Sequence, residues 1–101
     1  AGAVALASAL ADDPYPALVL CDCNTSDQTE DYTLLAALVK DTWREIGAGF
    51  GLTAPHGEGS APLLLRSDYI WHSGQFTPRW IAVWPESPSD HLPVLAGFDL
   101  P

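Results

Sequence analysis

The spacing of hydrophobic and polar residues changes along the chain, and each change predicts a different helix or strand. Ala3–Leu10 is rich in alanine and leucine and predicts a helix. The unbroken apolar run Ala17–Cys21 lies between turn-forming residues and predicts a short strand that is buried on both faces. A second helix is predicted to begin at Asp27 and to keep an apolar face as far as Val39, with Lys40 in its last turn.

The carboxyl-terminal part has a period of two, which is typical of strands. The glycine-rich stretch 47–60 predicts a long loop, and three strands are predicted after it, at Leu63–His72, Trp80–Trp84 and Leu92–Phe98. The order helix, strand, helix, loop and three strands predicts an α+β fold in which helices pack on a sheet. With 101 residues, the chain is expected to form a single domain over 1–101.

The composition is that of an acidic folded domain. Hydrophobic residues make up 48% of the chain, which predicts globular folding, and no stretch reaches the roughly 18 consecutive apolar residues that a membrane span needs. Thirteen acidic residues against four basic ones give a net charge of −9. Such a surface repels polyanions and argues against nucleic-acid binding by a basic face. A phosphate ester reached through a divalent cation stays compatible with it, because the cation inverts the local field.

Polar side chains with catalytic potential occur beside the predicted strands. Asp22 and Asn24 follow the first strand, Asp68 lies within a strand, and Asp90 and His91 precede the last one. A carboxylate can hold a metal ion, and an imidazole can hold or move a proton near neutral pH.

Each of these residues also has a structural explanation. Asp22 and Asn24 fit a loop in which their side chains bond to nearby backbone, and Asp68 fits a solvent-facing position on a strand. Asp90 fits a turn, and His91 fits a half-buried surface position. Local sequence alone leaves both interpretations open at every one of these positions.

The remaining chemistry-bearing residues give weaker signals. Cys21 and Cys23 would point to opposite faces of a strand, so a mutual disulfide is not expected, and their spacing with His91 suits a zinc site poorly. We interpret His56 and His72 as surface residues. The four tryptophans are interpreted as core or interface residues, because the chain has too little basic charge for a nucleic-acid stacking platform.

Three segments together resemble a known family. Their patterns are similar to the signatures Gly-Asp-Phe-Asn, Arg-x-Asp-Tyr-Ile and Ser-Asp-His-x-Pro, and they stand in the same order, at Cys21–Asn24, Arg66–Ile70 and Ser89–Pro93. Asp41–Arg44 followed by Gly51–Thr53 also matches the stretch between the first two signatures. Over essentially its whole length the chain resembles the carboxyl-terminal half of the endonuclease/exonuclease/phosphatase superfamily, which is DNase I-like.

The resemblance implies a hydrolase of phosphate esters that uses Mg²⁺ or Mn²⁺. By that resemblance Asp22 positions or deprotonates the attacking water, and Asn24 hydrogen-bonds the phosphate. Asp90 joins the metal environment. His91 stabilises charge on the phosphoryl oxygen or assists proton movement, and Asp68 orients His91. The implied substrate is a small phosphodiester, a lipid headgroup or a nucleic acid.

The chain departs from the family in length. The family's domain is more than twice as long, and its amino-terminal half supplies an asparagine and a metal-binding glutamate that have no counterpart here. The resemblance therefore implies half of an α/β/β/α sandwich, with a mixed or antiparallel sheet, helices on one face and an incomplete catalytic site. An exposed inner sheet face leads us to expect completion by homodimerisation. The alternative function is a non-catalytic, self-associating binding module.

Overall fold

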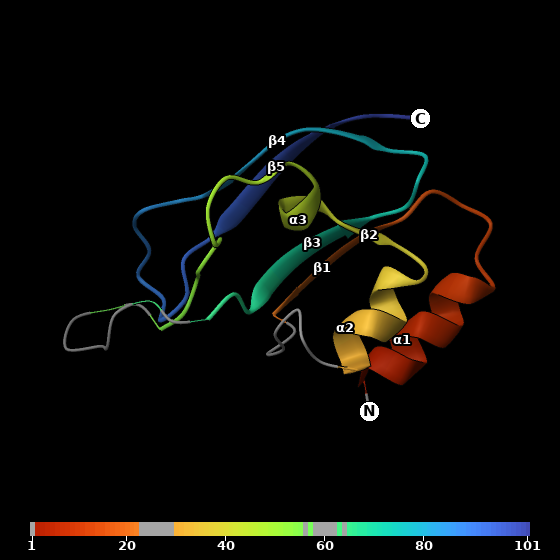
Figure 1. Cartoon of the computed structure of the whole chain (residues 1–101), viewed down its shortest axis with the longest axis horizontal. Helices are drawn as coiled ribbons and strands as arrows, with labels where there is room; N and C mark the ends of the chain where they lie inside the picture. The colour runs from red at the N-terminus through yellow and green to blue at the C-terminus, as the bar shows by residue number, and fades with distance from the viewer. Residues whose placement is uncertain (1, 23–29, 56, 58–62, 64) are drawn as a thin grey trace.

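The chain folds into two antiparallel sheets with three helices in the part that the structure describes (Figure 1). This structure is a computed structural model, and it describes residues 2–22, 30–55, 57, 63 and 65–101. Its elements are α1 (Gly2–Ala11), β1 (Leu18–Asp22), α2 (Glu30–Ala36), β2 (Lys40–Asp41), α3 (Thr42–Ile46), β3 (Asp68–His72), β4 (Thr77–Val83) and β5 (Val94–Asp99). The predicted α+β class and the antiparallel sheets are confirmed.

The larger sheet has the strand order β1-β3-β2 and carries the main core on one face. Helices α1 and α2 lie side by side against this sheet (Figure 1). Val19 of β1 packs there together with two rings of β3, because alternate residues of a strand share a face. The rings of Tyr69 and Trp71 stack with their centroids 5.7 Å apart. The buried cluster consists of Tyr32, Leu35, Val39, Tyr69 and Trp71. Within the described residues, no helix has both the length and the apolar character that crossing a membrane requires.

The opposite face of this sheet is only partly covered. Leu18 and Leu20 of β1 are 43% and 69% exposed, whereas Ile70 of β3 is buried. The prediction that the first strand is buried on both faces is therefore wrong. Only one face of β1 meets the helices, and an uninterrupted apolar run cannot reveal whether a second layer lies on the other side.

The smaller sheet is the hairpin of β4 and β5. The rings of His72 on β3 and Phe98 on β5 are 5.5 Å apart between centroids, so the two sheets meet at this point. On the hairpin, the Trp80 indole occupies the space that a Cβ at Gly97 would need. The absence of a side chain at Gly97 therefore lets the indole lie flat on the neighbouring strand.

Several predicted boundaries need correction. The helix predicted from Asp27 continues only to Ala36, and residues 27–29 lie outside the described residues. Lys40 begins strand β2 instead of ending a helix. The strand predicted at Leu63–His72 covers only Asp68–His72, and the last two strands are each shifted relative to the prediction.

Asp41 ends strand β2 and caps helix α3. Its carboxylate receives two hydrogen bonds from the Arg66 guanidinium, at 2.9 and 2.6 Å, and one from the Tyr32 hydroxyl at 2.8 Å. It also caps helix α3 by accepting from the Arg44 amide. Burial acts to lower the pKa of Arg66, but the hydrogen bonds to Asp41 and the negative charge of Asp41, together with smaller contributions from Tyr69 and Tyr32, outweigh burial and raise the pKa. The pair therefore fixes the residues that lead into β3.

His72 also lies differently from the prediction. It is 1% exposed, and its Nε2 lies 2.6 Å from Glu45 Oε1, while its Nδ1 lies 2.8 Å from the Ser73 carbonyl oxygen. The interpretation of His72 as a surface residue is wrong, because a partner 27 positions away satisfies it inside the fold. His56 lies outside the described residues.

Candidate functional site

The end of β1 and the start of β3 bring two acids together. Asp22 is the last residue of β1, Asp68 is the first residue of β3, and the two are register partners in the antiparallel ladder. Both therefore lie on the same face of the sheet as Leu20 and Ile70, opposite the helices. The sequence leads to this arrangement because each carboxylate stands where an apolar strand meets a polar connection.

His91 reaches the same place from the connection between β4 and β5. Its Nδ1 lies 2.6 Å from Asp68 Oδ2, and its Nε2 lies 3.9 Å from Asp22 Oδ2. One ligand atom from each of the three residues falls within 4.8 Å of the others. We call Asp22, Asp68 and His91 the Asp–Asp–His cluster.

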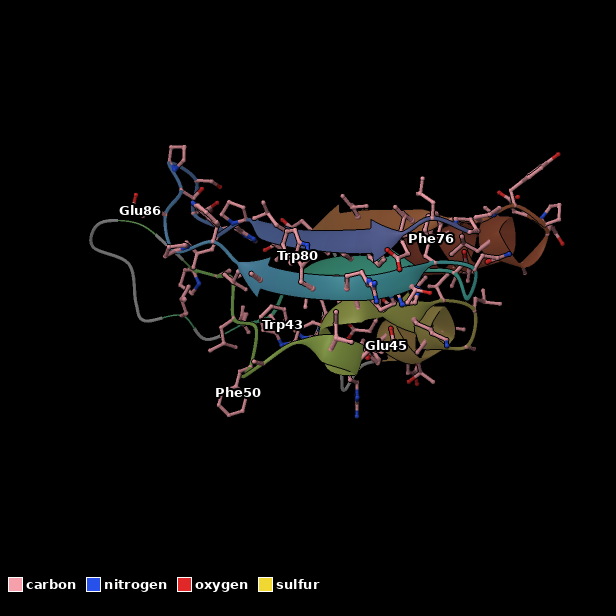
Figure 2. The ribbon with its side chains drawn as sticks, turned by 90° about the horizontal axis from the view of Figure 1, so that it is seen from above. Trp43, Glu45, Phe50, Phe76, Trp80 and Glu86 are labelled. Atoms are coloured by element: carbon pink, nitrogen blue, oxygen red, sulfur yellow. The ribbon has the colours of Figure 1, made fainter. Side chains whose placement is uncertain are left out.

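Local hydrogen bonds hold the connection that carries His91. The His91 amide donates to the Ser89 hydroxyl at 3.2 Å, and the Ser89 amide donates to the Ser87 hydroxyl at 3.0 Å. The Trp84 amide donates to the Pro93 carbonyl oxygen at 2.8 Å and closes the base of the connection. These bonds fix the backbone on both sides of the imidazole. Glu86 belongs to the same connection and lies at the periphery of the molecule (Figure 2).

The electrostatics of the cluster favour a charged imidazole. The hydrogen bond to Asp68 raises the pKa of His91 above its usual value, and burial opposes this. The charges of Asp68, Asp22 and Asp90 act in the same direction as the hydrogen bond. The carboxylate at Nδ1 also fixes the orientation of the ring, which places Nε2 3.9 Å from Asp22 Oδ2.

An open pocket of about 430 Å³ lies against the cluster. Apolar side chains form one part of its lining, including Leu20, Ile70 and Val94, and the three cluster residues form another. The pocket is therefore an accessible hollow on the uncovered face of the sheet, with the reactive groups at one end of β1 and β3.

The other predicted site residues lie at or beyond the margin of this cluster. Asp90 is exposed and accepts a hydrogen bond from the Ser89 hydroxyl at 3.3 Å, and it is not among the three grouped residues. Its carboxylate acts on His91 through its charge. Asn24 lies outside the described residues, and so does Cys23. Cys21 is disulfide-bonded, so the strand argument that spoke against a disulfide is wrong.

Two buried hydroxyl residues near the cluster were missed by the sequence reasoning. Ser67 Oγ lies 3.4 Å from His91 Nδ1 and 3.5 Å from Asp68 Oδ2. The Ser67 amide in turn donates to Thr53 Oγ1 at 3.3 Å. Both residues belong to segments that carry the family resemblance, and this was the signal that could have found them.

Comparisons with known proteins give no further assignment. No family model, curated protein or solved structure matches this chain.

Proposed function

We propose that the chain is a divalent-metal-dependent phosphoesterase of the endonuclease/exonuclease/phosphatase type, with the Asp–Asp–His cluster as its reacting centre. The observation that carries the proposal is the convergence of Asp22, Asp68 and His91, one from each of three separate signature segments, within 4.8 Å. If these three residues were only turn formers and surface acids, no physical cause would bring them together in one place. The domain would then be half of a DNase I-like α/β/β/α sandwich.

The residues of the cluster fit a hard divalent cation. Carboxylate oxygens suit Mg²⁺ and Mn²⁺, and an imidazole nitrogen is also acceptable to Mn²⁺. Asp22 and Asp68 would hold the ion with His91 beside it, and Asp90 would add negative charge at the margin. A bound cation supplies Lewis-acid polarisation of a phosphoryl oxygen. The two carboxylates leave most of an octahedral shell to water and substrate, so we expect weak metal binding.

The protein groups have distinct roles in the proposed hydrolysis. Asp22 is 50% exposed and can accept a proton from a water that enters the pocket. The oxygen of that water forms a bond to phosphorus as the opposite ester P–O bond breaks in line. His91, held at Nδ1 by Asp68, can donate a proton to the departing alkoxide from Nε2. The products are an alcohol and a phosphate with one ester bond fewer.

The acidic surface favours some classes of phosphate-ester substrate over others. A net charge of −9 disfavours a duplex nucleic acid, since polyanions are repelled at a distance. A small phosphodiester or a lipid headgroup carries less charge and fits the open, partly apolar pocket better. Nuclease activity is thus the less favoured form of the same chemistry.

The test is the hydrolysis of bis-p-nitrophenyl phosphate in Mg²⁺, in Mn²⁺ and in a chelator. The proposal predicts a rate that needs the cation and falls about 100-fold or more in Asp22→Asn. Asp12→Asn changes an exposed carboxylate just after α1 and serves as the matched control, which should keep the full rate. A rate that survives the chelator, or equal rates in both variants, would reject the proposal.

A second function is favoured by one specific observation. Leu20 is 69% exposed on the face that carries the cluster, and Leu18 on the same face is 43% exposed. As the alternative to a substrate in this pocket, we propose that a second copy of the chain covers this face, sheet against sheet about a two-fold axis. If the chain lacks hydrolytic activity, self-association through this face is the function that remains, as a binding module.

A further inference from the structure

Thr53 lies between the segment that leads into β3 and the connection that carries His91, and it belongs to neither sheet. It is 0% exposed, although threonine is usually found at the surface. Its amide donates to the Leu65 carbonyl oxygen at 2.8 Å, which joins it to the segment that leads into β3. The neighbouring residue Ala54 forms an isolated antiparallel bridge with the same Leu65. The backbone of Thr53 is therefore held firmly in place.

Two further bonds of Thr53 end beside the cluster residues. Its Oγ1 accepts from the Ser67 amide at 3.3 Å, and Ser67 directly precedes Asp68. Its carbonyl oxygen accepts from the Leu92 amide at 2.8 Å, and Leu92 directly follows His91. Strands β3 and β5 belong to different sheets, so the β ladders do not set the distance between these two segments. Bonds from one buried residue to both segments do set it.

We propose that Thr53 is a positioning residue that holds the imidazole of His91 against the carboxylate of Asp68. Its hydroxyl fixes the start of β3, and its carbonyl oxygen fixes the His91 connection. Ser67 belongs to the same arrangement. Its hydroxyl lies 3.4 Å from His91 Nδ1, and its amide donates the hydrogen bond that Thr53 Oγ1 accepts. The role in catalysis rests on the proposed function, whereas the positioning of His91 does not.

Loss of the hydroxyl alone should loosen this arrangement. In Thr53→Val the shape is nearly unchanged, but the Ser67 amide is left buried without its acceptor. The backbone around Ser67 and Asp68 can then shift, and the 2.6 Å contact between His91 Nδ1 and Asp68 Oδ2 lengthens. A displacement of about 1 Å in a reacting group can reduce a rate about 100-fold. We expect kcat to fall by about 10- to 100-fold, with KM within about twofold of wild type.

The test is the proton NMR signal of the His91 Nδ1–H group in the folded, ¹⁵N-labelled protein. The short bond to Asp68 predicts a far-downfield signal in wild type, because a charge-assisted bond deshields the proton. Thr53→Val should move this signal upfield or broaden it, and Thr53→Ser, which keeps the hydroxyl, should restore it. Thr42→Val is the matched control, since Thr42 is also 0% exposed but its hydroxyl has no hydrogen-bond partner in the described part of the chain.

An unchanged His91 signal in folded Thr53→Val would overturn the proposal. So would a Thr53→Ser protein that behaves like Thr53→Val, because the methyl group and not the hydroxyl would then matter. If Thr53→Val does not fold, amide hydrogen exchange in wild type gives the answer. Slow exchange at Ser67 and Leu92 supports the bonds from Thr53, and fast exchange at either overturns them. A wild-type protein without metal-dependent hydrolysis rejects the proposed function, but the NMR signal still tests the positioning.

Discussion

Asp22 and Asp68 stand directly opposite each other as the last pair of the β1–β3 ladder. Like charges at directly opposed positions of a sheet repel each other. The charged form of His91 lies beside both carboxylates and offsets this repulsion, at 2.6 Å from Asp68 and 3.9 Å from Asp22. The pair is therefore unfavourable for folding and favourable for holding a cation, which is a combination typical of functional sites.

Neutralising one of these acids should stabilise the metal-free fold and weaken the binding of a metal ion. In Asp22→Asn the repulsion disappears, so the metal-free protein should gain about 0.2–1 kcal/mol of stability at a pH above the raised pKa of His91, where the neutral imidazole no longer offsets the repulsion. The same variant should bind Mn²⁺ at least about tenfold more weakly, because one of few ligands is lost. Thermal denaturation in a chelator and calorimetric Mn²⁺ titration measure the two effects. A less stable variant, or one with unchanged Mn²⁺ affinity, would contradict the prediction.

The raised pKa of His91 predicts a pH-dependent stability. The folded state holds the proton more tightly than the unfolded state, whose imidazole titrates near pH 6.5. The stabilisation is therefore complete below about pH 6.5 and is lost as the pH rises through the raised pKa of the folded state. Urea denaturation of metal-free protein at a series of pH values measures it. Asp68→Asn removes the main cause of the raised pKa and should flatten the profile in this window, and superimposable profiles would refute the assignment.

Breaking the buried ion pair between Arg66 and Asp41 should destabilise the fold strongly. Their side chains are 11% and 3% exposed, so Arg66→Ala leaves a buried carboxylate without its main partner. Loss of one member of such a pair costs about 3–5 kcal/mol. Arg79→Ala is the matched control, because Arg79 and Asp99 form an ion pair at 3.1 Å with side chains 65% and 56% exposed, and it should cost less than about 1 kcal/mol. Equal losses in urea denaturation would show that the buried pair has no special role.

The uncovered face of the larger sheet predicts self-association that depends on Leu20. Sedimentation velocity should show a dimer of wild type whose population grows with concentration. Leu20→Asp should give a monomer with unchanged far-ultraviolet circular dichroism, because the side chain is 69% exposed in the single chain. Phe50→Asp is the control, since Phe50 is 85% exposed at the tip of the loop after α3 and points away from the body (Figure 2). A monomeric wild type at all concentrations would remove the second proposed function.

Local patterns predicted helices α1 and α2, strands β1, β3, β4 and β5, and the order of the candidate groups. The apolar run before Asp22 and the alternation that ends at His72 both become strands, and their polar ends meet in one ladder. These features follow from the period of a strand and from turn chemistry, both of which act over a few residues. The convergence of Asp22, Asp68 and His91 was expected only from the resemblance, since no local pattern sets distances between segments.

Features that depend on distant partners could not be predicted in this way. Asp41 pairs with Arg66 across 25 positions, and the chain around Asp41 forms β2 and α3 where the end of a helix was predicted. Glu45 satisfies His72 across 27 positions and buries a residue interpreted as exposed. The exposure of Leu20 depends on whether a second layer covers the sheet, and the apolar run itself is the same in both cases.

The rate of Mn²⁺-dependent phosphodiester hydrolysis by His91→Ala tests the central claim most directly. Wild type, His91→Ala and Arg79→Ala, purified side by side, are compared on bis-p-nitrophenyl phosphate at saturating Mn²⁺. The account predicts a rate in wild type and in Arg79→Ala that falls by about 100- to 10,000-fold in His91→Ala, the usual contribution of a positioned acid or base. Absence of a metal-dependent rate in wild type, or the same rate in His91→Ala, would contradict it.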